Sequence, residues 1–504
     1  MKKTYTVHFT TLGCKVNQYD SNEMMDMFRA KGFQPYNGAT AHNGTYCNPD
    51  VIIVNTCIVS SESERKSRQA IRRMRAKYPN ALLAAVGCYP QRNPELVSAI
   101  KGVDFIAGTT DHETLVNEII LRLGGNTQTA SDDGSNAVYM SSSPMASDGC
   151  PPAIIENNAL IPAGEIKQTA TDRGGQKIHK RLDLRTRTYI KIQDGCDSFC
   201  SYCIVPYTRG RARSRDLPNI LDEVEAKLSS GAPEIVLTGI NISSYRYSPA
   251  NELAIDLGGL INAVAKRMDS GAQPSHLHPR LHPRLRPRLR LSSLEPTIIT
   301  PSFVNVLLMN HNVICPHFHL SLQSGSESIL RRMNRNYTPA IFAEAVALLR
   351  GAFPGAAITT DIIAGLPGES ETNFIETMEF CRRIAFYRMH VFPYSMRPGT
   401  RAAEFPDQID PGEKRKRAKR LIALSDELSY DFHCRYIGKD VAILVENITG
   451  DCVEGLTDNY IRVQARVQAQ DKNTAAAGAL SRSAYSFVRI TGAAAACMYG
   501  EIII

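Results

Sequence analysis

The chain has 504 residues, of which 43% are hydrophobic and 21% charged, and its formal net charge is +8. These values exclude a disordered or fibrous chain and predict two or three globular domains, and the mild positive charge permits a polyanionic partner without requiring one. No apolar run reaches the ~20 residues that span a bilayer, and the residues before Cys14 are too few and too polar for a signal peptide. We therefore expect a cytoplasmic protein without membrane contact.

The first region, residues 1–123, alternates short apolar runs with segments of helical spacing. Alternating strands and helices indicate a parallel, doubly wound sheet, and hence an α/β fold. The predicted strands are Tyr5–Phe9, Val51–Val54, Leu82–Val86 and Val103–Ile106, and the predicted helices are Ser21–Ala30 and Glu64–Lys77.

Three cysteines of this region follow predicted strands. Cys14 comes after the first strand in TLGCKVNQ, Cys57 after the second in VNTCIV, and Cys88 after the third in AVGCYPQ. Loops that leave the carboxyl ends of parallel strands converge on one edge of the sheet, where such folds bind ligands. Each cysteine alone is explained as a small buried residue. All three at strand ends favour a metal cluster, and Cys47, in the polar stretch Asn37–Pro49, is left out of it.

Residues 124–181 are rich in Ser, Asn, Gly, Asp and Pro and show little periodicity. Such a segment has little core to offset the entropy of ordering, so we predict a linker or long insertion in which Cys150 has no role. A second insertion, Ser270–Arg290, repeats the tetrapeptide HPRL. Its prolines forbid a helix and indicate a tandem expansion in a surface loop rather than a metal or RNA site.

Cys196, Cys200 and Cys203 follow a short apolar strand in the spacing C-x-x-x-C-x-x-C. An iron–sulfur cube is normally held by four thiolates, so three on one tight loop leave the fourth iron open to another ligand. A structural zinc site usually has two C-x-x-C pairs, and no second pair is near in sequence. A disulfide would leave one of the three cysteines over. The spacing therefore favours a cluster with an open iron.

The central region, residues 182–434, contains six strand and helix alternations, two fewer than a closed eightfold barrel needs. We predict an open, partial (βα)6 barrel whose site lies at the carboxyl ends of its strands. The predicted strands are Thr188–Gln193, Glu234–Asn241, Leu289–Glu295, Phe318–Gln323, Ala357–Gly365 and Met389–Tyr394. Polar residues end these strands, namely Thr238, Gly239, Asn241, Ser292, Ser293, Glu295, Gln323, Ser324, Gly325, Asp361 and Gly365.

After a charged helix over residues 413–438, the last region, residues 435–504, returns to short alternating runs with Gly and Asn turns. This pattern predicts a small β-barrel of a kind that often binds RNA, although a barrel without a ligand fits the same pattern.

The cysteine loop, CDSFCSYC, resembles the radical S-adenosylmethionine (SAM) superfamily, and the longer string QDGCDSFCSYCIVPYTRGRARSR resembles its methylthiotransferase branch. GCKVNQYDS, NTC and GCYPQ are similar to the three cysteine motifs of the methylthiotransferase amino-terminal domain. LTGIN, RLSSLEP, LSLQSGS, DIIAGLPGE and FPYSMRPGT are similar to segments of its radical SAM domain, and residues 435–504 resemble the TRAM domain of RNA-modifying enzymes. The resemblance covers nearly the whole chain.

This resemblance implies two 4Fe-4S clusters and two equivalents of SAM per turnover. Cys196, Cys200 and Cys203 would hold the catalytic cluster, which passes an electron to SAM and releases a deoxyadenosyl radical. Cys14, Cys57 and Cys88 would hold an auxiliary cluster that presents a methylated sulfur. Glu295 and Asp361 are the preferred polar contacts of SAM. The implied partners are a tRNA anticodon loop, an external electron donor and a sulfur source.

The motif GCKVNQYDS is most similar to the corresponding motif of one subgroup. That subgroup places a methylthio group on the adenine C2 carbon of N-threonylcarbamoyladenosine beside the tRNA anticodon. Related enzymes act on isopentenyl-adenosine tRNA, where a GCQMN-like string is expected, or on a ribosomal-protein aspartate. A two-cluster electron carrier would explain the cysteines but not the central barrel. A simple RNA-binding module would leave both cysteine trios without a role.

Overall fold

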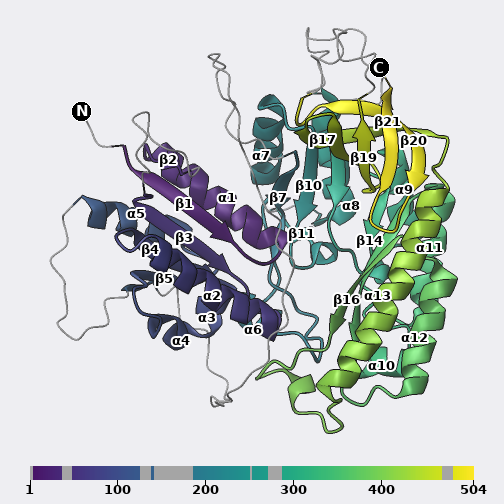
Figure 1. Ribbon diagram of the computed structural model, residues 1–504, viewed down its shortest axis with the longest axis horizontal. Coiled ribbons are helices and arrows are strands. Elements are labelled where there is room, and N and C mark those ends of the chain that lie inside the picture. Colours follow the sequence, from purple (N-terminus) through teal and green to yellow (C-terminus); the bar gives the residue numbers. More distant parts are fainter. Residues whose placement is uncertain are drawn as a thin grey trace.

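The structure is a computed structural model that describes residues 4–36, 48–124, 138–140, 186–249, 253–270, 286–467 and 481–503. Cys47, Cys150 and the HPRL repeats lie outside these residues. Three bodies follow one another along the chain: an amino-terminal sheet with its helices, a central arc of strands and helices, and a carboxyl-terminal barrel (Figure 1).

The amino-terminal sheet has six strands in the order β2-β1-β3-β4-β5-β6, all parallel. Its strands are β1 (Thr6–Thr11), β2 (Gln34–Pro35), β3 (Val51–Thr56), β4 (Leu82–Gly87), β5 (Phe105–Ala107) and β6 (Val138–Met140). Helices α1 (Lys15–Ala30) and α5 (His112–Leu123) cover one face. Helices α2 (Ser61–Lys77), α3 (Cys88–Arg92) and α4 (Pro94–Ser98) cover the other. The doubly wound prediction is confirmed.

Helices on both faces explain why β3 is buried at every position and is apolar through its first four residues. Strand β6 was not predicted. It lies in the stretch expected to be a linker, and it pairs with β5 at the edge of the sheet. The sheet therefore extends beyond residue 123. The strand was missed because a three-residue edge strand in polar sequence gives no periodic signal.

The central region forms two parallel three-stranded sheets, β13-β10-β7 and β14-β15-β16. Isolated parallel bridges, Leu289 to Ile314 and Leu294 to Leu320, join them into one arc. No pairing in the described residues joins β7 to β16, so the arc is the predicted open, partial barrel. Its strands are β7 (Thr188–Lys191), β10 (Glu234–Thr238), β13 (Arg288–Leu291), β14 (His317–His319), β15 (Ala357–Ala364) and β16 (Arg388–Pro393).

The outer face of this arc is covered by α7 (Leu217–Ser229), α8 (Leu257–Ser270), α9 (Pro301–Met309), α11 (Pro339–Ala352), α12 (Glu371–Ile384) and α13 (Pro411–Cys434). The short α6 (Val205–Arg209) packs against α3 of the amino-terminal domain, and α10 (Glu327–Arg332) belongs to a separate small core. The region also has 3-10 turns η1 (Ile242–Ser244), η2 (Pro296–Ile298) and η3 (Arg401–Ala403). Two small antiparallel pairs complete the region: β8 (Gln193–Asp194) with β9 (Arg213–Ser214), and β11 (Arg246–Tyr247) with β12 (Ile255–Asp256).

Most strands of the arc alternate between apolar and polar residues. Every second residue of a strand, such as Leu237, Leu289 and Ile358, belongs to the apolar core beneath the helices. Successive side chains of a strand point to opposite faces, so the residues between them face the inside of the arc. That inner set is mostly polar: Glu234, Arg288, Arg290, His317, His319, Thr359, Asp361 and His390. The inner face of the arc is therefore lined with charged and polar side chains and is not a second apolar core.

The carboxyl-terminal body is a closed five-stranded barrel in the order β17-β18-β19-β21-β20, as predicted. Its strands are β17 (Asp440–Thr449), β18 (Cys452–Thr457), β19 (Arg462–Arg466), β20 (Tyr485–Ala493) and β21 (Met498–Ile503). Tyr485 donates its hydroxyl to the carbonyl of Pro233 (2.9 Å), and Asn459 donates to the carbonyl of Gly355 (3.2 Å). Both acceptors precede strands of the arc, so the barrel closes the amino-terminal end of the arc.

None of the helices in the described part of the chain combines the length and apolar character needed to cross a membrane.

Candidate active site

Cys14, Cys57 and Cys88 come together at one edge of the amino-terminal sheet. They follow β1, β3 and β4, which are neighbours in the sheet, so their loops leave side by side. A Cβ placed on Gly13 would lie only 3.0 Å from the Cβ of Cys57, so a side chain there would crowd the second cysteine. Burial raises the pKa of the Cys88 thiol to about 12, and the nearby Cys14 and Cys57 add to this shift.

Asn17 fixes the loop that carries Cys14. Its side-chain nitrogen donates to the carbonyls of Leu12 (3.1 Å) and Thr56 (2.7 Å), which belong to the loops after β1 and β3. Its side-chain oxygen accepts from the Cys14 thiol at 3.4 Å. The two loops are thereby tied together, and the Asn17 amide, which is fully buried, has partners for both of its polar atoms.

The second trio lies on the loop between β8 and α6. Gly195 has a φ of +70°, and a Cβ there would lie 1.9 Å from the carbonyl oxygen of Arg211, so only glycine allows the loop to close. The amide of Cys196 donates to the carbonyl of Gly210 (3.1 Å), and the amide of Cys203 donates to the carbonyl of Cys200 (3.0 Å). These bonds fold the loop so that the three thiols share one small region.

Arg335 lies against this trio. It donates from one terminal nitrogen to the Cys200 thiol (3.2 Å) and from the other to Glu295 (2.5 Å). Burial, with the neighbouring Cys200, raises the pKa of Cys203 to about 12. A metal-free loop therefore favours neutral thiols, whereas coordination to a metal deprotonates them.

Arg209 connects the first trio to the central domain. Its Nε donates to the Cys88 thiol at 3.3 Å, and its terminal nitrogens reach Asp194 (3.0 Å), Asp20 (3.2 Å) and Asn17 (2.9 Å). Only 1% of this side chain is exposed. Arg209 follows Cys203 by six residues, mostly in α6, a separation of roughly 9 Å at the rise of a helix. Arg209 therefore ties the site of Cys14, Cys57 and Cys88 to the segment that carries the second trio.

The spacing of the thiols argues against single metal ions. Zinc bonds of about 2.3 Å in tetrahedral geometry would bring two thiolates to roughly 3.8 Å. Among the residues that the structure describes, the only triplet with ligand atoms within 4.8 Å of one another is His319, Asp361 and His390. The two cysteine trios are therefore more widely spaced than a single ion requires, which suits a larger cluster.

Glu295 and Asp361, the predicted SAM contacts, occupy different surroundings. Glu295 lines a cavity of about 680 Å³ beside the cluster loop, together with Asp197, Ser198, Asn241 and Arg335. Asp361 is absent from the lining of that cavity. It lies on the inner face of the arc, where His319 (3.2 Å) and His390 (3.3 Å) contact its carboxylate. Burial opposes ionisation, but these two histidines hold the pKa of Asp361 well below its usual range. Both contacts with SAM stay predictions.

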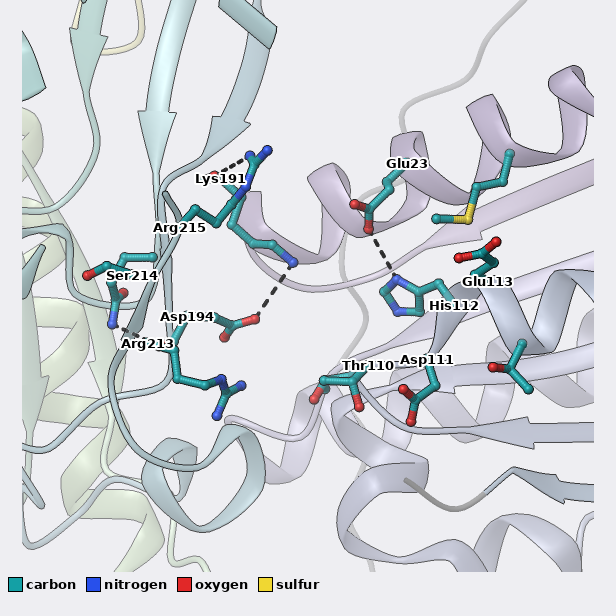
Figure 2. A pocket seen from close by; sticks show the side chains of 14 residues that line it. Glu23, Thr110, Asp111, His112, Glu113, Lys191, Asp194, Arg213, Ser214 and Arg215 are labelled. Carbon is teal, nitrogen blue, oxygen red and sulfur yellow. Dashed lines mark hydrogen bonds and ion pairs between the residues drawn. The ribbon is translucent and has the colours of Figure 1, made fainter. Parts of the chain in front are cut away.

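A second cavity of about 460 Å³ opens between the amino-terminal domain and the strands after β7 (Figure 2). Lys191 contacts Asp194 (3.7 Å) on one side of it, and Glu23 contacts His112 (3.3 Å) on the other. Lys191 also pairs with Asp20 of α1 (2.6 Å). None of the six cysteines lines this cavity, so it belongs to the domain interface and not to the cluster sites.

Lys15 is the functional candidate that the sequence did not single out. It is the first residue of α1, directly after Cys14, and is half-buried. Burial, with the positive charge of Arg290 on β13, lowers its pKa to about 8, while Asp361 on β15 acts in the opposite direction. A residue of the amino-terminal domain thus shares an electrostatic environment with the inside of the arc.

Comparison with known proteins agrees with this arrangement. A model for the family described as uncharacterized protein family UPF0004 matches residues 6–108, and the radical SAM superfamily model matches residues 190–381. A Bacillus subtilis protein named threonylcarbamoyladenosine tRNA methylthiotransferase MtaB is 34% identical over 91% of this chain and 90% of its own. The chain belongs to the radical SAM methylthiotransferase family.

Other members of the family have different substrates in their names. An MtaB protein of Aquifex aeolicus is 31% identical over 91% of this chain and 96% of its own. A Geobacter metallireducens protein named tRNA-2-methylthio-N(6)-dimethylallyladenosine synthase is 30% identical over 91% of both chains. The radical SAM methyltransferase TsrM of Kitasatospora setae, solved with cobalamin and a 4Fe-4S cluster, has a TM-score of 0.52 at 14% identity and covers 79% of this chain and 77% of its own. That likeness confirms the fold.

This methylthiotransferase uses SAM and 4Fe-4S clusters, as its family does. The residues present fit those groups: each site offers three thiols more widely spaced than a single ion needs, and one buried arginine donates to a thiol at each site. Arginine beside a thiolate offsets the cost of burying negative charge. Sequence spacing had indicated the cysteines, but not Arg209 or Arg335, whose cysteine partners lie 121 and 135 residues away.

Proposed function

We propose that this methylthiotransferase places a methylthio group on the adenine C2 carbon of N-threonylcarbamoyladenosine beside the anticodon of tRNA. The observation that carries the proposal is the presence of two cysteine trios, one of them contacted by Arg209 of the central domain, in a chain 34% identical to a protein named for that reaction. The motif GCKVNQYDS around Cys14 supports the same substrate. The reaction also needs an external electron donor and a sulfur source, and we expect it to take place in the cytoplasm.

The chemistry explains the need for cofactors. An aromatic C–H bond is not opened by acid–base groups, and the bound SAM and clusters supply the radical chemistry and the sulfur for this step. Cys196, Cys200 and Cys203 would hold one cluster and leave one iron open to SAM. Cys14, Cys57 and Cys88 would hold the other.

Other residues of the chain would bind and orient SAM and the adenine base, and would enclose the site. Glu295, fixed by Arg335, is the preferred polar contact for SAM in the cavity beside the cluster loop. The inner face of the arc offers polar groups to an adenine base taken out of its stack, as a single-stranded anticodon loop allows. The carboxyl-terminal barrel closes the far end of the arc, and RNA binding by this TRAM-like domain stays a prediction.

The proposal is tested with anticodon stem-loop RNAs that carry either threonylcarbamoyladenosine or dimethylallyladenosine at the same position. Reconstituted enzyme, SAM, a reductant and sulfide are added, and nucleosides are analysed by mass spectrometry. We expect the methylthio product from the threonylcarbamoyl RNA. In the variant Cys200→Ala, deoxyadenosine formation should be lost while the auxiliary cluster keeps its spectrum. Product from the dimethylallyl RNA alone would assign the other substrate, and deoxyadenosine formed by Cys200→Ala would refute the cluster assignment.

A further inference from the structure

Phe392 is a half-exposed aromatic residue on the inner face of the arc. It belongs to β16, in which Met389 and Val391 pack into the apolar core beneath the helices. Successive side chains of a strand point to opposite faces, so Phe392 shares the inner face with His390, which contacts Asp361 there. Phe392 is 51% exposed, and among the described residues no aromatic ring or cation stacks on it. Half of its surface is therefore free to contact a ligand.

The neighbouring strand connects Phe392 to the loop of the second trio. Phe392 pairs with Ile363 of β15. Ile363 packs against the same small apolar core as Tyr202, which lies between Cys200 and Cys203. Phe392 is therefore separated from the loop of the second trio by one strand and the core beside it.

The segment that follows β16 contacts the loop of the first trio. The hydroxyl of Ser395, three residues after Phe392, accepts a hydrogen bond from the amide of Ser61 at 2.9 Å. Ser61 follows Cys57 by four residues. Three residues of chain span at most about 10 Å, so Phe392 also lies near the segment that leaves the first trio.

Two more exposed apolar side chains flank the contact between Ser61 and Ser395. Val59, two residues before Ser61, is 53% exposed, and Met396, next to Ser395, is 42% exposed. Single exposed apolar residues are common, but several in one place indicate a binding site. A flat aromatic ring among them suits a nucleobase, because every base has a π face that can stack on it.

We propose that Phe392 stacks on the adenine base that receives the methylthio group and holds it between the loops of the two trios. The inference rests on the proposed function and deepens it, because it names the residue that positions the substrate base. A base taken out of the anticodon loop loses its stacking neighbours, and the ring of Phe392 replaces one of them. Stacking occupies the face of the base and leaves the C2 carbon accessible at its edge.

The test measures binding, without reductant, of two stem-loop RNAs to the reconstituted protein. The RNAs have the same sequence, but one carries threonylcarbamoyladenosine where the other carries an abasic ribose. Wild-type protein should bind the first more tightly by about five- to a hundredfold, the range for stacking of one base. Phe392→Ala should remove most of this preference and bind the abasic RNA as wild type does. Phe392→Tyr should keep the preference, because tyrosine retains the flat ring.

Tyr430→Ala is the matched control, because Tyr430 is also half-exposed but lies on α13, which covers the outer face of the arc. It should bind both RNAs as wild type does. Iron content and absorption spectrum show whether each variant keeps its clusters. Phe392→Leu, which keeps an apolar side chain without the flat ring, replaces Phe392→Ala if that variant loses iron.

Equal losses of affinity for both RNAs in the Phe392 variant would overturn the inference. Wild-type protein that binds the abasic RNA as tightly as the other would overturn it as well. Base-dependent binding through Phe392 without methylthio product would support the inference and refute the proposed reaction alone.

Discussion

Arg209 contacts several parts of the site at once. It touches a cysteine after β4, an asparagine and an aspartate of α1, and an aspartate of β8. Its positive charge opposes the effect of burial on the pKa of Cys88. A guanidinium makes several such contacts at once in fixed directions, which lysine cannot copy. Arg209 therefore both joins the two domains and favours the ligating form of Cys88.

Replacing Arg209 by Gln should lower the free energy of unfolding by about 3 to 5 kcal/mol, since the change leaves buried acidic partners without their cation. It should also weaken the auxiliary cluster, so that iron per chain falls from about eight toward about four. Denaturant unfolding and iron analysis measure the two effects. Arg211→Gln is the control, because Arg211 lies two residues away and is 73% exposed in its pair with Asp197. Equal iron in both variants would contradict this role.

The six cysteine positions could be predicted from sequence because strand ends and short loop spacing are local features. The arginines could not be, because Cys88 and Arg209 meet only after two domains have packed together. The contacts of Asp361 could not be predicted from sequence either. Its place at the end of a predicted strand suggested a SAM contact, but the histidines that hold it come from β14 and β16.

At the level of elements, the arc is built from strands with an apolar outer side and a charged inner side. All six of its strands were predicted, including β13, which pairs in register with β10. The predicted surface insertion Ser270–Arg290 is wrong at its end, because Arg288–Arg290 are buried residues of β13. The charged inner partners were not predicted. Arg290, with 2% of its side chain exposed, and Glu234, with 1%, form a buried ion pair across these two strands. The alternation of apolar and polar residues predicts which side chains of a strand face inward. It does not predict which charged side chains pair, because that depends on the order of the strands in the sheet.

Burial alone raises the pKa of Glu234, but Arg290 and Arg187 outweigh it and hold the pKa below its ordinary value of 4.5. The stabilisation from this carboxylate is therefore present above pH 4.5 and is lost as the pH falls through the lowered value. Glu234→Gln should reduce the free energy of unfolding at pH 7 by about 3 to 5 kcal/mol, with a difference from wild type that shrinks in acid.

Urea unfolding between pH 3 and 8 measures this dependence. Glu225→Gln is the matched control, since Glu225 pairs with Arg267 on exposed helix surfaces and should cost less than about 1 kcal/mol. A Glu234→Gln penalty that is the same at pH 3.5 and pH 7 would show that the carboxylate charge contributes nothing to the arc.

At the scale of the whole molecule, the two outer bodies close the arc from opposite ends. The amino-terminal sheet brings its cysteine edge to the carboxyl ends of the arc strands through α1, α3 and α6, while the barrel lies at their amino-terminal ends (Figure 1). This order of bodies was predicted from sequence, but their docking was not. The docking matters most, because it brings Arg209 of the central domain into contact with Cys88 of the amino-terminal domain.

The central claim is that each trio holds its own 4Fe-4S cluster, and iron and sulfide analysis of anaerobically reconstituted protein tests it most directly. We predict about eight irons per chain for the wild type and about four for either Cys88→Ala or Cys200→Ala. A wild-type protein that binds about four irons, or a single substitution that removes all of them, would contradict the account.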